Sequence, residues 1–414
     1  MVRTSSPYLI IFALWMLVFA SSSQIMIIAP ILPRIGEELA IPETIQGTLI
    51  SAYGILLGIF ALIIGPISDK IGRRRVLLLG SGCMTLALGL HAAAIDYISL
   101  MIVRALAGAA GGLLSGAAVS YVGDYFPYER RGWANGWIMS GVAFGQIIGI
   151  PLGTVLAEAF GFRIPFLLFS VVMAGSYLLI LLKVPQPQVQ FDQNPLSVRS
   201  ALSNYVKMLG NPQIAAAGAT FFLLFFAIAL YVVYLPTWIE KSLGVSGNEV
   251  AMMFLVGGVA SVISGPQAGR LSDRLGRKPL IILSCIGMAI VSIVTTTLAT
   301  SMIVAYILFF LAMVLMSMRI SPLQALLTAL VPAGRRGTLL SLTVAIGQIG
   351  ISIGGAIAGP VYTYSGFFAS TALAAIALLL TAWVVGAALP EPSLGVELKK
   401  TEQVPATIGS SVTE

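Results

Sequence analysis

Long apolar stretches follow one another along almost the whole chain, and only short polar segments separate them. A helix of about 20 such residues crosses the hydrocarbon core of a bilayer. Of the 414 residues, 58% are hydrophobic and 9% are charged, whereas a soluble domain carries roughly a quarter charged residues. So few charges could not cover the surface of a soluble protein of this length. The sequence therefore predicts an all-α integral membrane protein.

Twelve transmembrane helices are predicted, six in each half of the chain. In the first half they cover about 8–31, 44–66, 76–95, 98–123, 133–158 and 164–183. In the second half they cover about 213–237, 249–268, 280–298, 302–330, 338–362 and 367–389. The first apolar run is far longer than the core of a signal peptide, so we interpret it as a retained span.

The longest polar interval runs from Pro185 to Asn211 and separates the two halves. Four regions are predicted: an N-terminal six-helix bundle (1–184), a cytoplasmic linker (185–211), a C-terminal six-helix bundle (212–390) and a disordered cytoplasmic tail (391–414). A short amphipathic helix is expected in the linker around 202–209.

The orientation follows from the basic residues of the short loops. With the N-terminus inside, 18 of the 23 Lys and Arg residues face the cytoplasm, and only Arg34, Arg163 and Lys241 face outward. Arg104 and Arg319 lie inside spans. Both termini are therefore predicted to be cytoplasmic, in a multi-pass protein of the cytoplasmic (inner) cell membrane. The basic residues lie in short clusters between apolar runs, so the net charge of +7 reflects the orientation of the chain in the membrane. No nucleic-acid partner is therefore expected.

The two halves repeat one another. Gly65 to Arg75 reads GPISDKIGRRR, and Gly269 to Pro279 reads GRLSDRLGRKP. Further landmarks recur at nearly the same offset of 204 or 205 residues: Arg130-Arg131-Gly132 as Arg335-Arg336-Gly337, and Gly161-Phe162 as Gly366-Phe367. Because each half has an even number of spans, this is a parallel repeat about an axis along the membrane normal. Two such bundles would enclose a central cavity.

These motifs carry a resemblance to the major facilitator superfamily. Gly65 to Arg75 resembles its signature between spans two and three, and Gly269 to Lys278 resembles the second copy. LMIVRALAG (100–108) is similar to the fourth-span signature with its buried Arg, and GDYFPYERRG (123–132) to the loop that follows. GVAFGQIIGIPLG (141–153) resembles the fifth-span motif of exporters in the drug:proton antiporter branch.

The resemblance implies a cytoplasmic latch. Asp69 would meet the N-terminus of span eleven near Thr338, and Arg73 or Arg74 would pair with Asp124 or Glu129. Alternatively, this loop is only a positive-inside anchor, although an anchor needs neither the Asp nor the glycines. The expected latch residues are Gly65, Asp69, Gly72, Arg73, Arg74, Asp124, Glu129, Arg130, Asp273 and Arg277.

Arg104 and Arg319 are candidates for an anion site or for tuning proton transfer. A buried Arg is costly and usually faces the bundle interior or a water-filled cavity. The alternative is an Arg that bonds only to backbone and Gln side chains. The candidates for the transport cavity are Gln24, Tyr53, Arg104, Gln146, Tyr231, Tyr234, Arg319, Gln324 and Gln348. Each uncharged candidate is as consistent with a structural hydrogen bond as with a contact to the substrate. His91, near a helix end, is expected to be satisfied by the membrane interface.

Four glycines repeat every four residues in the fifth span and so share one helix face: Gly141, Gly145, Gly149 and Gly153. Pro151 permits a bend there. We expect this face to form a pliable contact between the two bundles, with Gly347, Gly350, Gly354, Gly355 and Gly359 of span eleven as a counterpart.

The chain departs from the family pattern in one respect. Proton-coupled exporters of the family usually carry a carboxylate within the membrane, and here none of the 16 Asp and Glu residues falls at mid-membrane. The two Arg residues are the central charges, which favours an anionic or neutral substrate. Asp69 or Asp124 could still titrate as the gate opens.

The predicted function is a monomeric secondary transporter that exports a small amphipathic or anionic molecule, with proton antiport as the expected coupling. An importer or anion exchanger, and a non-transporting receptor or scaffold on the same fold, remain alternatives. No enzymatic activity, cofactor or metal site is expected, because the chain has two Cys, one His and no phosphate-binding loop.

Overall fold

The structure is a computed structural model that describes residues 6–187, 198–331 and 336–391, and these residues contain helices but no strands. The first half contains α1 (Pro7–Met26), α2 (Ile28–Glu38), α3 (Glu43–Gln46), α4 (Thr48–Ile71), α5 (Arg73–Leu90), η1 (His91–Ala93), α6 (Tyr97–Leu114), α7 (Ala117–Tyr125), α8 (Tyr128–Phe144), the π-helical turn η2 (Gly145–Gly149), α9 (Ile150–Phe160) and α10 (Arg163–Lys183).

A linker helix, α11 (Val198–Leu209), precedes the second half, where the sequence predicted a short amphipathic helix. The remaining helices are α12 (Pro212–Val232), α13 (Leu235–Leu243), α14 (Gly247–Leu275), α15 (Arg277–Leu298), α16 (Met302–Met318), α17 (Ile320–Ala329) and α18 (Arg336–Ala388). The predicted tail lies outside the described residues, apart from Glu391.

Eleven helical segments of the described chain are long and apolar enough to cross a membrane. The last of them, Gly337–Ala388, has 52 residues and contains Gly366 in a non-helical conformation, with φ 78° and ψ 172°. A twelve-span chain would divide at this glycine, because the 22 residues that follow it (367–388) are themselves long enough to span the hydrocarbon core.

The internal repeat is visible in the backbone. Gly72 and Gly276 have φ of 92° and 94°, and Gly161 and Gly366 have φ of 90° and 78°, a conformation that only glycine adopts readily. The fourth span of each half is also broken at a similar place, at Ser115 between α6 and α7 and at Arg319 between α16 and α17. The break at Arg319 lies just before Ser321 and Pro322.

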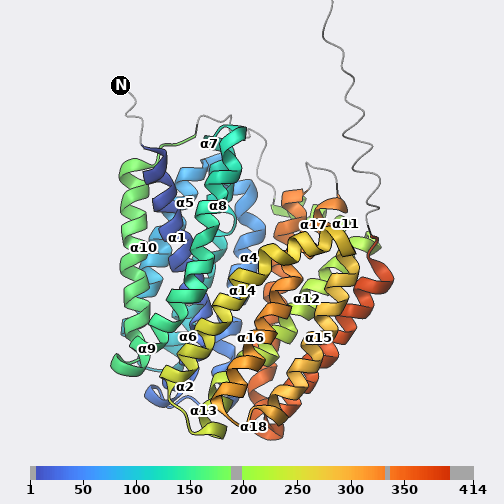
Figure 1. The fold of residues 1–414 in the computed structure, drawn as a ribbon. Coiled ribbons are helices and arrows are strands. Elements are labelled where there is room, and N and C mark those ends of the chain that lie inside the picture. Colours follow the sequence, from blue (N-terminus) through green and yellow to red (C-terminus); the bar gives the residue numbers. More distant parts are fainter. Residues whose placement is uncertain (1–5, 188–197, 332–335, 392–414) are drawn as a thin grey trace, which may run out of the picture.

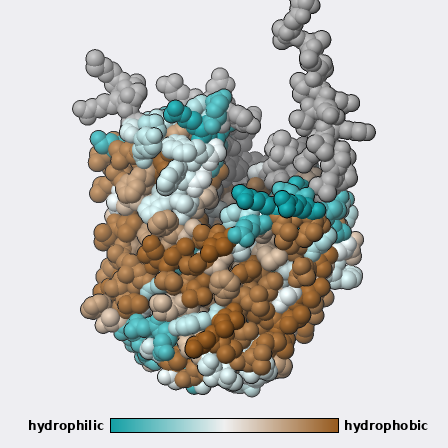
Figure 2. Space-filling model, viewed as in Figure 1, coloured by the Kyte–Doolittle hydropathy of each residue, from teal (hydrophilic) through white to brown (hydrophobic). Residues whose placement is uncertain are grey.

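The two halves form two bundles that lie side by side and meet most closely at the end that carries α2 and α13 (Figure 1). Within the first, α1 packs against α8 and α10, and α4 against α6. Within the second, α12 and α15 pack against α18, and α14 against α16. Between the bundles, α4 contacts α18, and α14 contacts α9 and η2. The face shown in Figure 2 is largely covered by hydrophobic residues, as a lipid-facing surface requires.

The ion pairs and charged caps concentrate at the two ends of the bundles. We call the end that carries α2 and α13, opposite the N-terminus in Figure 1, the distal end. At the start of α6, Asp96 and Ser99 form a capping box. Their hydrogen bonds hold the pKa of the Asp96 carboxyl below its usual value. Glu391 caps α15 by accepting hydrogen bonds from the backbone amides of Arg277 and Lys278, at 2.7 and 2.8 Å.

Candidate functional site

The two bundles meet closely where the distal part of α3 and α4 lies against α18, a contact that we call the distal seam. A Cβ added to Gly47 would lie 2.1 Å from the carbonyl oxygen of Gly355, and one added to Gly359 would lie 2.2 Å from that of Thr44. Backbone therefore touches backbone across the seam, which glycine alone permits. Ser51 Oγ donates a hydrogen bond to the carbonyl of Ser352 at the same level.

Polar side chains close the seam at its distal edge. Tyr234, which lies between α12 and α13, donates its hydroxyl proton to the Glu43 carbonyl and accepts a hydrogen bond of 3.0 Å from the backbone amide of Gly47. Lys241 of α13 forms an ion pair with Glu43. Tyr234 and Lys241 belong to the second bundle, and Glu43 and Gly47 to the first. These contacts therefore join the two halves of the molecule.

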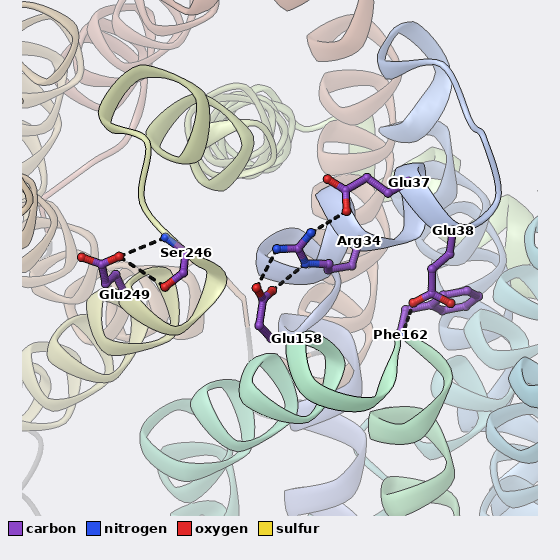
Figure 3. Close-up of polar contacts among 7 residues, drawn as sticks. All are labelled: Arg34, Glu37, Glu38, Glu158, Phe162, Ser246 and Glu249. Atoms are coloured by element: carbon purple, nitrogen blue, oxygen red, sulfur yellow. Dashed lines mark hydrogen bonds and ion pairs between the residues drawn. The ribbon is translucent and has the colours of Figure 1, made fainter.

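A second group of charges surrounds Arg34 on α2 (Figure 3). Its guanidinium makes a bidentate pair with Glu158 of α9, at 2.5 and 2.7 Å, and also contacts Glu37. The bonds to Glu158 raise the pKa of Arg34. Beside them, Glu38 accepts hydrogen bonds from the Phe162 amide and from Arg163, which tie α2 to the start of α10.

A cavity of about 540 Å³ lies among these groups at the distal end. Both bundles contribute to its wall: Pro33, Arg34, Gly36, Glu37, Ile41, Pro42, Glu43 and Gln46 come from the first, and Thr237, Glu240, Lys241 and Val245 from the second. The cavity therefore lies directly over the line along which the bundles would part.

A further contact between the bundles runs from α14 to η2 and α9. A Cβ on Gly258 would lie 2.9 Å from the backbone of Gln146, and one on Gly247 would lie 2.6 Å from Glu158 Oε2. In Figure 1, α14 lies beside α9 near the distal end and leans away from α8 toward the other end. The π-helical turn, followed by Pro151, makes this segment of the fifth span irregular.

Three of the predicted cavity residues come together inside the first bundle, in what we call the Arg104 cluster. Arg104 on α6 donates to Gln24 Oε1 at 3.3 Å and lies 4.6 Å from the centre of the Tyr53 ring. Gln24 Nε2 donates to the Tyr53 hydroxyl at 2.9 Å. All three side chains are buried, with exposed fractions of 0 to 3%, and Arg104 Nε has no hydrogen-bond partner. An uncompensated donor on a buried cation is expensive unless a ligand satisfies it.

The remaining candidates are dispersed. Tyr231 shares a hydrogen bond of 3.0 Å with Thr295, inside the second bundle. Arg319 is buried at the junction of α16 and α17, where its guanidinium interacts with the thiol of Cys285 on α15. Gln348 faces Gly54 across the seam, and Gln324 is exposed. Gln146 and Tyr234 lie in the contacts between the bundles described above.

His91 is buried rather than placed at the membrane interface. Its ring stacks on Phe166 with centroids 4.0 Å apart, and Nδ1 lies 2.8 Å from the Ala87 carbonyl. The helix continues into the one-turn η1 at this position, which turns the ring inward against α10.

The latch region shows one of the expected ion pairs. Arg73 Nε lies 2.7 Å from Asp124 of α7, and Arg73 also donates to Ser68 Oγ at 2.8 Å. Arg74 instead donates to the carbonyls of Val184 and Leu181, at the end of α10. Glu129, Arg130 and Asp273 are exposed. Gly65 and Asp69 belong to α4, but their surroundings, like residues 332–335, lie outside the described part of the chain.

The glycine face of the fifth span packs differently from the prediction. A Cβ on Gly141 would lie 2.9 Å from the Trp15 carbonyl, and one on Gly149 would lie 2.1 Å from Ser23 Oγ. Gly145 and Gly153 likewise face Ser23 and Ile27. The face therefore packs on α1 of the same bundle, and the expectation of a contact between the bundles was wrong. Four-residue spacing identifies a shared face but not the helix that covers it.

The glycines of span eleven, which were predicted to face the fifth span, make two kinds of contact, within their own bundle and between the bundles. Gly347, Gly350 and Gly354 pack against α12 in their own bundle. Gly355 and Gly359 instead meet the first bundle across the distal seam.

The sequence reasoning missed the groups that close the distal end. Glu43, Thr44, Gly47 and Ser51 were not singled out, because they lie at or near the start of a span and match no motif. A signal was nevertheless present: Gly47, Gly54 and Gly58 lie on one face of the second span, as Gly355 and Gly359 do on span eleven. Among the described residues, no group of three His, Cys, Asp or Glu side chains could hold a metal ion.

Comparison with known proteins gives consistent matches over most of the chain. The sequence profile of the Major Facilitator Superfamily matches residues 14–246 and 217–411. The multidrug resistance protein MdtG of Proteus mirabilis (strain HI4320) is 25% identical over 388 residues, which cover 90% of this chain and 95% of that protein. The uncharacterized MFS-type transporter YwfA of Bacillus subtilis (strain 168) is 25% identical, with 88% of each chain covered.

Two solved structures share the fold. A D-xylose-proton symporter superposes with a TM-score of 0.76 at 18% identity, covering 94% of this chain and 98% of that one. The human organic anion transporter MFSD10 (TETRAN) superposes with a TM-score of 0.69 at 15% identity, covering 92% of this chain and 99% of that one.

Proposed function

Because the chain belongs to the major facilitator superfamily and is a multi-pass membrane transporter, we propose that it works by alternating access and exports a small amphipathic or anionic molecule. The distal seam is the observation that carries the proposal. It joins two separately packed bundles through glycine backbone contacts and a few polar side chains. Contacts of this kind can separate while each bundle keeps its own core.

Closure at the distal end is one of the two states that alternating access requires. In the proposed topology the distal end faces outward, both termini are cytoplasmic, and Gly366 divides the last helix so that the chain has twelve spans. The present arrangement then seals the outer side of the pathway. In the opposite state, the latch around Arg73 and Asp124 would close the cytoplasmic side.

The Arg104 cluster is our candidate for substrate recognition. It offers a buried guanidinium with an unpartnered Nε, an amide and a phenol hydroxyl. An anionic or hydrogen-bonding substrate would offset the desolvation of Arg104. The cluster is buried in the present state, so the substrate would reach it as the bundles part.

Export is favoured by relatives that are named multidrug resistance proteins. We expect proton antiport to drive export. The sequence has no carboxylate in the middle of a predicted span, so the proton would act on a gate rather than at mid-membrane. The transporter is expected to act as a monomer, without a cofactor, in the cell membrane.

Proteoliposomes with an imposed pH gradient test this proposal. We expect a fluorescent organic anion such as fluorescein to be transported faster than a cationic dye such as ethidium. Arg104→Ala should abolish transport of the anion, whereas Arg163→Ala, which removes an Arg of the distal end, should leave it largely intact. Equal transport of both dyes, or unchanged anion transport by Arg104→Ala, would contradict the proposed substrate class.

A further inference from the structure

A second hollow lies on the outer wall of the first bundle, away from both contacts between the bundles. It has a volume of about 430 Å³, within the range of small-ligand pockets. Its walls come from α1 (Tyr8, Ile11, Phe12 and Trp15) and from α8 (Trp133 and Trp137), and we call it the aromatic groove. None of these residues belongs to the Arg104 cluster or to the distal seam.

The walls of the groove are held in place by contacts between the two helices. Tyr8 packs edge-on against Trp133, with ring centroids 5.7 Å apart. Trp15 donates its indole N–H to Ser140 Oγ at 3.0 Å. The rings of Phe12 and Trp15 are stacked. Tyr8, Phe12, Trp133 and Trp137 nevertheless keep 39 to 72% of their surface exposed. This leaves a preformed apolar slot at the surface of the first bundle.

A cation stands at one end of the slot. Arg130, Trp133 and Trp137 follow one another at spacings of three and four residues on α8, so they lie along one face of that helix. Arg130 is exposed in the first turn of α8. Seven residues separate it from Trp137, so the groove extends about 10 Å from the charge toward the membrane interior. A positive charge at the water interface followed by an apolar slot matches the two parts of a phospholipid.

We propose that the aromatic groove binds an anionic phospholipid from the leaflet at the N-terminal end of the bundles. Arg130 contacts the headgroup phosphate, and an acyl chain lies between α1 and α8 against Trp15, Trp133 and Trp137. Basic residues between membrane helices are suited to anionic headgroups. Burial of each methylene of the acyl chain adds to the binding.

The occupant is a lipid because of where the slot opens. The exposed rings of α1 lie on the side of that helix opposite Gln24, which faces the interior of the first bundle. Because these rings belong to a membrane span and point away from the bundle interior, the molecules that reach them are those of the bilayer. An interfacial belt of Trp and Tyr alone would explain their depth. It would not explain a hollow of this volume or its alignment with Arg130.

Tryptophan quenching by brominated lipids tests the proposal. The chain has five Trp residues, and in a Trp238→Phe/Trp383→Phe background only the three Trp residues of the groove remain. A control protein with Trp15, Trp133 and Trp137 replaced by Phe keeps Trp238 on α13 and Trp383 on α18, the latter 69% exposed. Both are reconstituted into phosphatidylcholine vesicles that contain a small fraction of acyl-brominated phosphatidylglycerol, or the same fraction of brominated phosphatidylcholine.

In the groove protein, we expect brominated phosphatidylglycerol to reach half-maximal quenching at a mole fraction about fivefold lower than brominated phosphatidylcholine. The control protein should show no preference. Arg130→Gln should remove the preference and Arg130→Lys should keep it, with circular dichroism confirming that each variant is folded. Equal quenching by both lipids in the groove protein, or a preference that survives Arg130→Gln, would overturn the proposal.

Discussion

At the scale of single residues, the Arg104 cluster combines two properties that a purely structural group would not need together. The guanidinium is buried among neutral partners, and one of its donors is unsatisfied. Such a group lowers the stability of the folded protein, since replacing a buried charge with an apolar side chain of similar volume is often neutral or stabilising. We therefore infer that its role is in binding rather than in folding.

Replacing Arg104 with Met should separate these two roles. We expect the thermal midpoint of the purified protein to stay the same or to rise, by a free energy of up to about 3 kcal/mol, while transport of the anionic probe falls to background. Thermal unfolding in detergent and proteoliposome transport measure the two effects.

Gln24→Leu is the matched control for this experiment. It keeps the charge but deprives Arg104 and Tyr53 of a partner, and should cost about 1–3 kcal/mol of stability. A strongly destabilised Arg104→Met protein would indicate that Arg104 is a structural residue.

At the scale of elements, glycine determines which helices can approach one another, but it acts in two distinct settings. Along α18, Gly350 lies against α12 of its own bundle, with an added Cβ 2.4 Å from the Phe222 carbonyl. Gly359, further along the same helix, lies against Thr44 of the other bundle. The contact of Gly350 belongs to the core of the second bundle, and the contact of Gly359 belongs to the distal seam, which must open.

Alanine substitutions should distinguish these settings. Gly359→Ala should prevent full closure of the distal seam, because its Cβ meets backbone, and should increase maleimide labelling of a cysteine at Thr237 in the distal cavity several-fold. Gly350→Ala should instead lower stability by about 1–3 kcal/mol without increasing that labelling.

Gly136→Ala in α8, where an added Cβ meets nothing within 4 Å, provides the neutral control. If Gly359→Ala and Gly136→Ala were labelled equally fast, the seam would not depend on close backbone approach.

The elements also show how far the sequence could predict the structure. The apolar runs located nearly every spanning helix, because the need to satisfy backbone hydrogen bonds in lipid leaves few other options. Among the pairings of Arg73 or Arg74 with Asp124 or Glu129 that the family resemblance implied, the structure contains that of Arg73 with Asp124. Periodicity could not identify the helix that packs against Gly141 and the glycines on the same face. A row of glycines shows only that a neighbouring helix can approach closely, not which helix it is. The ion pair of Glu43 with Lys241 could not be predicted from the sequence either, because the two residues lie 198 positions apart in the chain.

At the scale of the whole molecule, the distribution of charge defines two ends. Three basic residues are predicted to face outward: Arg34, Arg163 and Lys241. All three lie at the distal end, where each is paired with a carboxylate. Arg73, Arg74 and the linker helix lie toward the opposite end. This asymmetry is what the positive-inside rule requires of a protein with its distal end outward.

Cysteine accessibility in intact cells tests this orientation. After Cys83 and Cys285 are replaced by Ser, a cysteine at Gly244 should react with a membrane-impermeant maleimide, and one at Lys207 should react only after the cells are permeabilised. Both positions are exposed. The opposite pattern would invert the proposed topology.

The central claim is that the distal seam must open in every transport cycle, and a reversible cross-link tests it most directly. In a protein without Cys83 and Cys285, cysteines at Glu43 and Lys241 can be joined across the bundles with a short bis-methanethiosulfonate reagent. Cysteines at Glu38 and Arg163 provide the matched control, because they replace an ion pair of the same end within one bundle. We predict that the first cross-link stops transport of the anionic probe until a reductant is added, whereas the second does not. Undiminished transport by the protein cross-linked between Glu43 and Lys241 would contradict alternating access at this seam.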